Sequence, residues 1–317
     1  MFALGLTLAA TGFSVHAQSW PTARPVKIIL PAAPGGSSDP LARLMAEELG
    51  RTLGGNFIVE NKPGANGNVG ASFVAKSDPD GYTILFSWTG TLISAVTLYK
   101  AKPFHPINDF ESIALIGSIP NVITVDARLP IKSLNDLTEY AKKNPGMTYA
   151  SSGPNTQQQI GVESFARCKG LTFKHVPTKG GSSANTALMG KHVDFIAGSG
   201  SHIPLVEQGV FRELVTFHVD ARDPKRPDIP VMKDIGCPPT NPPNGMIIVA
   251  PAGLPDPIAT KLTAAFKQVS DTPEFKKLLD KYNLDYAYED GKSVQDKFPA
   301  EIEWYKKYFT EAGMTLR

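Results

Sequence analysis

A repeated order of hydrophobic run, glycine-rich turn and amphipathic segment restricts the fold of this chain more than any other feature. The first unit has the run VKIIL at 26–30, a turn rich in Gly, Pro and Ser, and a segment at 41–54 with its apolar residues on one face. Similar runs at 57–61, 82–87 and 147–152 precede predicted helices at 68–76, 90–98 and 156–169. Strands that alternate with helices predict an α/β fold, with mainly parallel sheets flanked by helices.

Residues at the predicted helix ends support this assignment. Asp39 followed by Pro40 predicts an N-cap and a first helical residue, and Gly54 predicts the end of that helix. Ser133 and Asp136 have nearly the spacing and chemistry of a capping box. The turns after the strands therefore lead directly into helix N-termini.

The length of 317 residues suits two domains of about 150 residues each. Two segments are expected to cross between the domains, the strand-rich stretch 112–126 and the proline-rich stretch 237–245. The predicted domain 1 is discontinuous, and the C-terminal helices that belong to it are assigned to packing alone. The predicted ranges are 18–118 plus 246–317 for domain 1, 119–245 for domain 2, and 256–271, 273–282 and 292–311 for the C-terminal helices.

The N-terminus indicates export. Residues 2–15 are uncharged and mostly apolar, and Val15-His16-Ala17 resembles a cleavage site of the A-x-A type, so residues 1–17 are predicted to be a signal peptide. No Lys or Arg precedes the apolar run, which argues for a natural start upstream of Met1. The run is too short to cross a bilayer. We expect a soluble periplasmic protein, in which Cys168 and Cys237 are two separately buried thiols rather than a pair.

Composition and motifs argue against several functions. The 32 Lys and Arg residues balance 30 Asp and Glu residues and form no basic stripe, so no nucleic acid is expected as a partner. No Walker A, GxGxxG, GxSxG, HExxH or CxxC motif is present, the histidines lack metal-binding spacing, and the glycines at 64–70 indicate a turn before a helix. No cofactor or metal is expected. A triad of Ser199, His202 and Asp39 is an alternative that no nucleophile motif supports.

Two loops between a strand and a helix have the composition of an anion site. Residues 34–39 follow the first strand, and residues 152–156 follow the run at 147–152. Glycines let backbone N–H groups approach a ligand, and a helix N-terminus adds positive potential, so such a loop can hold an anion without arginine. Each loop taken singly also fits an ordinary turn, where Gly and Ser are common for backbone reasons. The prediction depends on the two loops facing each other across a cleft.

Other strand ends supply further candidates. Trp88 can stack on a flat ligand or pack against the next helix, and the sequence leaves both readings open. The candidate ligand-binding residues are Pro34, Gly35, Gly36, Ser37, Ser38 and Asp39 in the first loop; Ser87, Trp88 and Thr89; Ser152, Gly153, Asn155 and Thr156 in the second loop; Thr178; and Ser199 with His202.

Six segments carry a resemblance to a known family. They are, in order, WPTARPVKIILPAAPGGSSDPLARLMAEEL, VENKPGANGNVGASFVAKSDPDGYTILF, DFESIALIGSIPNVITV, MTYASSGPNTQQQIGVESF, VPTKGGSSANTALMGKHVDFIAG and RPDIPVMKDIGC. In their order and spacing the chain resembles the substrate-binding receptors of tripartite tricarboxylate transporters, the Bug or TctC family of bacterial periplasmic proteins. The resemblance covers almost all of the predicted mature chain.

The resemblance implies a two-domain periplasmic-binding-protein fold of the Venus-flytrap type, with a hinge and a ligand cleft between the domains. It implies that the loops 34–39 and 152–156 hold ligand carboxylates. The implied protein is not an enzyme: it is a solute-binding protein of a family that delivers di- or tricarboxylates, aromatic acids or amino acids to integral-membrane transporter subunits. We expect a monomer whose ligand is a small aromatic or aliphatic mono- or dicarboxylate.

Three features beside the expected cleft bear on the ligand. Pro34 and the run Thr178-Lys179-Gly180 depart from the usual family pattern. Trp88 and His202 favour an aromatic carboxylate, such as a phthalate isomer, over an aliphatic one. A hydrolase or lyase acting on a small carboxylate, and a sensory receptor subunit, are the alternative functions.

Overall fold

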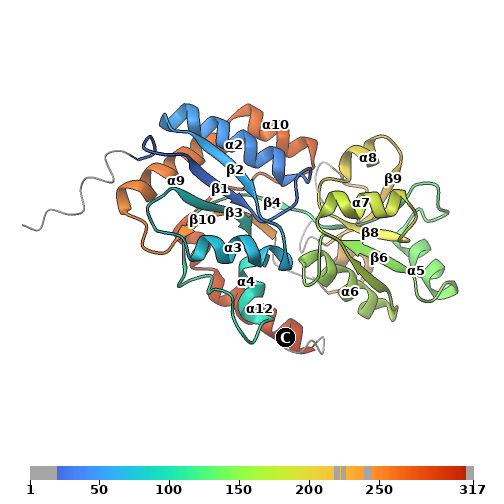
Figure 1. Cartoon of the computed structure of the whole chain (residues 1–317). Helices are drawn as coiled ribbons and strands as arrows, with labels where there is room; N and C mark the ends of the chain where they lie inside the picture. The colour runs from blue at the N-terminus through green and yellow to red at the C-terminus, as the bar shows by residue number, and fades with distance from the viewer. Residues whose placement is uncertain (1–19, 218–221, 223–225, 239–243, 312–317) are drawn as a thin grey trace, which may run out of the picture.

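The computed structural model describes residues 20–217, 222, 226–238 and 244–311. The predicted signal peptide, 1–17, lies outside the described residues. Two β-sheets divide the rest into two lobes (Figure 1). We call the lobe built on the six-stranded sheet lobe 1 and the lobe built on the five-stranded sheet lobe 2.

Lobe 1 contains both ends of the described chain. Its sheet has the strand order β11-β4-β10-β3-β1-β2. The strands are β1 (Val26–Leu30), β2 (Phe57–Asn61), β3 (Thr83–Trp88), β4 (Phe110–Ile119), β10 (Asn244–Pro251) and β11 (Glu289–Asp290). The helices are α2 (Ser38–Leu53), η1 (Ala65–Gly67), α3 (Asn68–Ala75), α4 (Thr89–Thr97), α9 (Asp256–Asp271), α10 (Pro273–Lys281), α11 (Gly291–Gln295) and α12 (Phe298–Glu311).

Lobe 2 is formed by the middle of the chain. Its sheet has the strand order β7-β6-β8-β5-β9. The strands are β5 (Val122–Asp126), β6 (Thr148–Ser151), β7 (Lys174–Pro177), β8 (Phe195–Gly198) and β9 (Phe211–Thr216). The helices are α5 (Leu134–Lys143), α6 (Gln157–Lys169), α7 (Gly181–Met189), α8 (Ile203–Glu207) and η2 (Met232–Ile235).

Both sheets are mixed, which refines the prediction of mainly parallel sheets. Strands joined by helices are parallel as expected: β1 pairs with β2 and β3, and β6 pairs with β7 and β8. By contrast, β10 is antiparallel to β3 and β4, and β5 is antiparallel to β8 and β9. The antiparallel pairings belong to the strands at the two crossings, because a chain that arrives from the other lobe enters the sheet from the opposite end.

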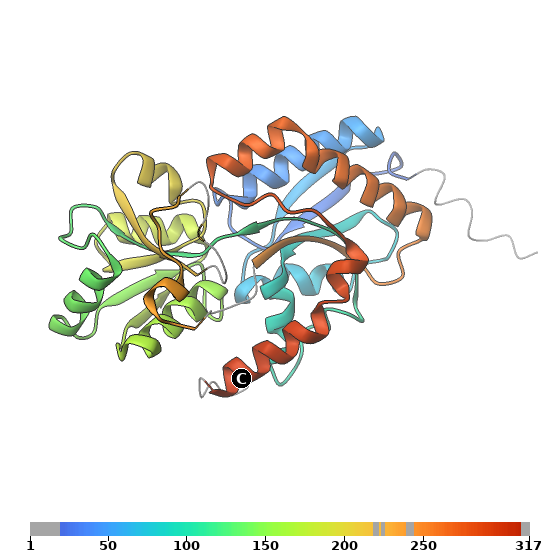
Figure 2. The ribbon, with the colours of Figure 1, turned by 180° about the vertical axis from the view of Figure 1, so that it is seen from behind.

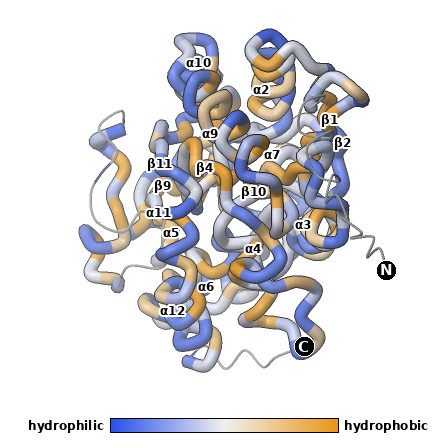
Figure 3. Tube along the Cα trace, turned by 90° about the vertical axis from the view of Figure 1, so that its left-hand side faces the viewer, coloured by the Kyte–Doolittle hydropathy of each residue, from blue (hydrophilic) through white to orange (hydrophobic). Residues whose placement is uncertain are grey.

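Each sheet is buried on both faces, which explains the continuous hydrophobic runs of the strands. Along β1, Ile28 packs into the core under α2 and α9, whereas its neighbour Ile29 packs into the core with α3, α4 and α12. In lobe 2, Ala150 and Ile196 face α7, and Tyr149 and Phe195 face α5 and α6. Figure 3 shows the hydrophobic stretches along strands such as β4 and β10 and hydrophilic residues on the outer turns of α10.

The first crossing lies within the predicted segment 112–126, whereas residues 239–243 of the predicted second crossing lie outside the described residues. β4 in lobe 1 continues after two residues into β5 in lobe 2, and the chain returns into β10, which lies between β3 and β4 (Figure 2). The sheets therefore divide the chain near the proposed domain boundaries, which themselves stay a prediction. In the described part of the chain, no helix is long and apolar enough to span a membrane.

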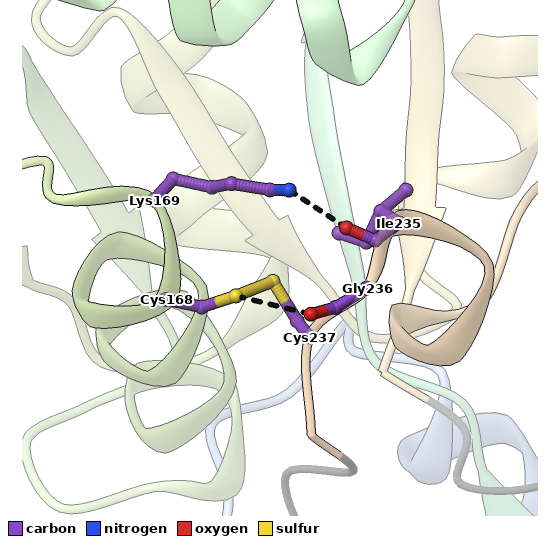
Figure 4. Close-up of a disulfide and its surroundings, with 5 residues drawn as sticks. All are labelled: Cys168, Lys169, Ile235, Gly236 and Cys237. Carbon is purple, nitrogen blue, oxygen red and sulfur yellow. Dashed lines mark hydrogen bonds between the residues drawn. A yellow bond between two sulfur atoms is a disulfide. The ribbon is translucent and has the colours of Figure 1, made fainter.

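The prediction of two separate thiols was wrong. Cys168, near the end of α6, forms a disulfide with Cys237, which follows η2, with their Cα atoms 5.8 Å apart (Figure 4). Beside it, the Lys169 ammonium donates a hydrogen bond to the carbonyl of Ile235 at 2.7 Å. The sequence separation of 69 residues concealed this proximity, which results from the packing of α6 against the segment leading to the second crossing.

Helix boundaries depart from the sequence prediction at two places. α2 begins at Ser38 after Ser37, so Asp39 lies in the first turn and is not the N-cap. The predicted helix at 292–311 is two helices, α11 and α12, because Pro299 has no N–H to donate to the carbonyl of Gln295. The capping box of Ser133 and Asp136 is confirmed.

Candidate ligand-binding site

A cavity of about 500 Å³ lies between the lobes. Residues from both lobes and from both crossings line it. They are residues 31–34, 36–39, 63–67, 88, 90 and 91 of lobe 1, residues 119, 121 and 244 at the crossings, and residues 152–154, 156–158, 178–183, 199 and 201 of lobe 2. The two predicted loops therefore open on one space.

Most of the residues predicted from the sequence line this cavity. They are Pro34, Gly36, Ser37, Ser38, Asp39, Trp88, Ser152, Gly153, Thr156, Thr178 and Ser199. Trp88 borders the cavity and packs against the lobe 1 core that α2 and α9 cover, so the stacking reading stays a prediction.

Four other predicted residues lie beside the cavity without lining it. The carbonyl of Gly35 accepts a hydrogen bond from the hydroxyl of Ser182. Ser87 is fully buried, and the hydroxyl of Thr89 accepts a hydrogen bond from the backbone N–H of Gly245. Asn155 is also buried, and its backbone N–H donates to Gln159. Their positions at strand ends placed them near the site, but the hydrogen bonds described for Gly35, Thr89 and Asn155 are made within the protein.

His202 is the largest correction to the predicted site. Its side chain is 1% exposed, does not line the cavity, and its Nε2 lies 2.7 Å from the Glu213 carboxylate. Arg226 also donates to Glu213. Burial by itself raises the pKa of Glu213, but the hydrogen bonds and charges of His202 and Arg226 together lower it. His202 is thus held inside lobe 2 by an ionised carboxylate.

The proposed triad does not assemble. His202 is bonded to Glu213, and the Asp39 carboxylate accepts hydrogen bonds from Arg43 and Asn61. Ser199 lies at the cavity, where its carbonyl accepts from Ser37. Within residues 20–217, 222, 226–238 and 244–311, no cluster of three His, Cys, Asp or Glu side chains is placed to hold a metal ion.

The N-termini of five helices open on the cavity: α2, α3 and α4 from lobe 1, and α6 and α7 from lobe 2. In α2, α3, α4 and α7 no side chain caps the first turn. By contrast, Ser133 caps α5 and Thr272 caps α10, and neither of these residues lines the cavity. The free N–H groups of a helix N-terminus attract anions. The cavity therefore offers uncapped donors from both lobes.

Charged side chains at the cavity are few. Asp39 is paired with Arg43, with 3.1 Å between a guanidinium nitrogen and Oδ1. Lys179 is the basic residue among the described residues that line the cavity. Its ammonium adds to the positive potential of the helix N-termini, while the Asp39 charge is compensated within lobe 1. The arrangement favours a negatively charged ligand.

Hydrogen bonds between the facing loops join the lobes beside the cavity. The Ser37 hydroxyl donates to the carbonyl of Ser199 at 3.1 Å, and Ser182 donates to the carbonyl of Gly35 at 2.6 Å. At another point, Asn66 donates to the carbonyl of Asn155 at 3.1 Å. These contacts border the cavity, so the two lobes touch each other in this structure.

Polar side chains hold the lobe 2 loops in place. The Ser151 hydroxyl donates to the carbonyl of Gly153 and lies 2.7 Å from Nε2 of His175. Thr178 donates from its hydroxyl to the carbonyls of Ser151 and Gly180. Burial lowers the pKa of His175 to about 4, so its ring is neutral at pH 7. A neutral imidazole can donate from Nε2 to Ser151, which fixes the loop before α6.

Sequence reasoning missed two parts of the site. The loop 63–67 lines the cavity, although its glycines were interpreted as a turn before a helix. Asn66 in this loop has a positive φ angle, a conformation that glycine adopts readily, and its side chain donates a hydrogen bond to Asn155 of lobe 2. Gln157 and Gln158, in the first turn of α6, and Asn121 and Asn244, at the crossings, also line it. A search of every helix start after a strand would have found the glutamines.

Residues 41–307 match the family described as "Tripartite tricarboxylate transporter family receptor". A similar curated protein, "UPF0065 protein in gbd 5'region" of Cupriavidus necator, is 33% identical over 313 residues, which cover 96% of this chain and 92% of that protein.

Solved structures are similar over nearly the whole chain. "Periplasmic binding protein BugD" has a TM-score of 0.87 at 28% identity, with 93% of this chain and 99% of that chain covered. Rpa4515 of R. palustris, solved with adipate, has a TM-score of 0.86 at 28% identity, covering 94% and 100%. MatC of Rhodopseudomonas palustris, solved with bound malate, has a TM-score of 0.82 at 26% identity, covering 91% and 99%.

Proposed function

The chain belongs to the tripartite tricarboxylate transporter receptor family, a family of periplasmic solute-binding proteins and not of enzymes, and from this premise we propose that it captures a small dicarboxylate between its lobes. The observation that carries the proposal is the cavity between the lobes, on which uncapped helix N-termini from both lobes open.

The two groups of helix N-termini suit a ligand with a negative charge at each end. α2 and α4 supply N–H groups from lobe 1, and α7 supplies them from lobe 2 together with Lys179. A hydrogen bond to a charged group contributes about 1.5–3 kcal/mol. Three or four such bonds supply the roughly 8 kcal/mol that corresponds to micromolar affinity.

The size of the cavity and the similar proteins support the same ligand class. A volume of about 500 Å³ is within the usual range for small-molecule sites. Adipate and malate, the molecules with which Rpa4515 and MatC were solved, are aliphatic dicarboxylates. The case for an aromatic acid now depends on Trp88 alone, because His202 does not line the cavity.

Calorimetric titration with adipate, malate, succinate and the phthalate isomers tests this proposal. We expect at least one dicarboxylate to bind at micromolar concentration and to raise the melting temperature with dose, because ligand binding stabilises the folded form. The monocarboxylates hexanoate and benzoate are the matched controls. Equal binding of each monocarboxylate and its dicarboxylate counterpart would contradict a site for two charges, and preference for phthalates would assign Trp88 the stacking role.

The proposed function also concerns where the protein acts and to what it delivers its ligand. We infer export through the signal peptide 1–17, action in the periplasm as a monomer, and delivery of the ligand to membrane transporter subunits, as the family description indicates. Deletion of this protein should abolish cellular uptake of the dicarboxylate that it binds. If this protein binds the dicarboxylate tightly but its deletion leaves uptake unchanged, the sensory alternative is favoured.

A further inference from the structure

Gln157 of lobe 2 is held by a residue of lobe 1. It is the first residue of α6, it lines the cavity, and its side chain is 5% exposed. Its Nε2 donates a hydrogen bond to the Tyr305 hydroxyl of α12 at 2.5 Å. Tyr305 is 1% exposed, so water cannot readily replace this bond.

Gly90 leaves the space in which this contact forms. It lies in the first turn of α4, and a Cβ added there would stand 2.9 Å from Nε2 of Gln157 and 3.0 Å from the Tyr305 hydroxyl. Gly90 also lines the cavity. α4 and α12 pack together in lobe 1, so lobe 1 alone forms the recess that receives the carboxamide.

The Tyr305 hydroxyl is suited to a permanent hydrogen bond. Burial is the largest cause that raises its pKa above the usual value for tyrosine, so the hydroxyl keeps its proton at physiological pH. The hydroxyl accepts from Gln157 and still has a proton of its own to donate. The hydrogen bond between Gln157 and Tyr305 therefore does not depend on pH in the physiological range.

We propose that Tyr305 is a positioning residue that fixes Gln157 against Gly90 when the lobes close, so that Gln157 contributes to ligand recognition in the closed form. This role rests on the proposed dicarboxylate function. Because Gln157 and Tyr305 belong to different lobes, the open form lacks the contact, and the positioned carboxamide adds to the difference in ligand affinity between the two forms. The C-terminal helix thereby takes part in recognition without lining the cavity.

Tyr308, one turn further along α12, provides the matched control. Its hydroxyl accepts from Ser164 at 3.0 Å and donates to the carbonyl of Ile160 at 3.2 Å. Both partners are on α6, and neither lines the cavity. Tyr308 therefore joins the same two helices without contacting a residue of the site.

A double-mutant cycle on ligand affinity tests the proposal. Adipate and malate are titrated into wild type, Y305F, Q157M and the double variant, with Y308F in both backgrounds as control. We expect Y305F and Q157M each to weaken binding by about tenfold, and the double variant to weaken it by about tenfold and not a hundredfold. The effect of Y308F should multiply with that of Q157M.

G90A checks the same contact without removing a polar group. Alanine fits the helical backbone of α4, and its methyl group displaces the flexible end of Gln157 from Tyr305. We expect weaker binding of the same order as in Y305F, with a melting temperature of the ligand-free protein no lower than that of wild type. A drop in that melting temperature would contradict the local displacement on which the argument depends.

The remaining outcomes separate the two proposals. Binding of adipate or malate to wild type with unchanged affinity in Y305F and G90A would overturn the positioning role alone. Multiplicative effects of Y305F and Q157M would also overturn it, because Tyr305 would then act independently of Gln157. Failure of wild type to bind either acid would overturn the proposed dicarboxylate function, and the positioning role with it.

Discussion

Lobe 1 has strands of up to ten residues and extensive cores on both faces of its sheet, whereas β6, β7 and β8 of lobe 2 have four residues each. Lobe 2 adds the Cys168–Cys237 disulfide and the buried group of Glu213, His202 and Arg226. Lobe 2, which has the shorter strands, is thus stabilised in addition by a disulfide and by a buried ionic group. One α/β plan is stabilised in two ways within a single chain.

The two lobes also differ in how they position the helix starts and loops that border the cavity. In lobe 1, the starts of α2 and α4 lack side-chain caps and are placed by the packing of the helices on the sheet. In lobe 2, Thr156 caps α6, and Ser151, His175 and Thr178 support the adjoining loops. Lobe 2 should therefore be more sensitive than lobe 1 to loss of a single polar side chain.

Removing the disulfide should produce the largest difference in stability between the two lobes. We expect the double variant C168S/C237S to lower the free energy of unfolding of lobe 2 by about 2–4 kcal/mol, because the bond closes a long loop. Trp20, Trp88 and Trp304 all lie in lobe 1, so tryptophan fluorescence follows lobe 1 and far-ultraviolet circular dichroism follows both lobes. In urea, the dichroism transition should shift and the fluorescence transition should not. Equal shifts would mean that the lobes unfold as one unit.

A negative charge added to either side of the cavity tests whether the ligand bridges both lobes. We expect Ser38→Asp in lobe 1 and Ser152→Asp in lobe 2 each to weaken dicarboxylate binding by well over tenfold, or more than about 1.4 kcal/mol, through repulsion of like charges. Ser38→Asn and Ser152→Asn are the neutral controls, and calorimetry is the measurement. Loss of binding on one side alone would place both carboxylates on that lobe.

The lobes should respond to pH in opposite directions. His175 in lobe 2 has its pKa lowered to about 4 by burial, so only the unfolded chain takes up this proton between about pH 6.5 and 4, and lobe 2 loses stability as pH falls through that window. Glu301 in lobe 1 has its pKa raised to about 7 by burial, so lobe 1 loses stability as pH rises from about 4.5 to 7. The same two spectroscopic probes measure both effects.

Two variants serve as controls for the pH responses. H175Q should reduce the acid sensitivity of the dichroism transition and leave fluorescence unchanged, and E301Q should flatten the response of the fluorescence transition. A pH response of lobe 1 that survives E301Q would point to other carboxyl groups. Glu111, whose pKa burial also raises, is the next residue to test.

The smallest effects are expected from the hydrogen bonds between the rims of the lobes. Ser37 is buried, so Ser37→Ala should weaken ligand binding by about threefold, whereas the exposed bond of Ser182 can be replaced by water and Ser182→Ala should cost less than about twofold. Calorimetry on both variants checks this order. A larger effect of Ser182→Ala would mean that lobe 2 controls closure.

Part of this fold and site could be predicted from the sequence. The runs VKIIL and YTILFS identify strands because both faces of each sheet are buried, and composition identifies the loops 34–39 and 152–156. The bond between Gln157 and Tyr305 and the disulfide join residues 148 and 69 positions apart, and no local pattern encodes such contacts. The orientation of His202 was missed for the same reason, because Glu213 attracts it away from the cavity.

The position of β10 in the middle of the lobe 1 sheet imposes an order on folding. β10 lies between β3 and β4 but follows all of lobe 2 in the chain, so the lobe 2 sheet can complete itself while β3 and β4 still lack a neighbour. Until β10 inserts, the unpaired edges of β3 and β4 are exposed to pairing with other chains. A chain that ends before residues 244–251 therefore presents two unpaired strand edges, which the complete chain covers.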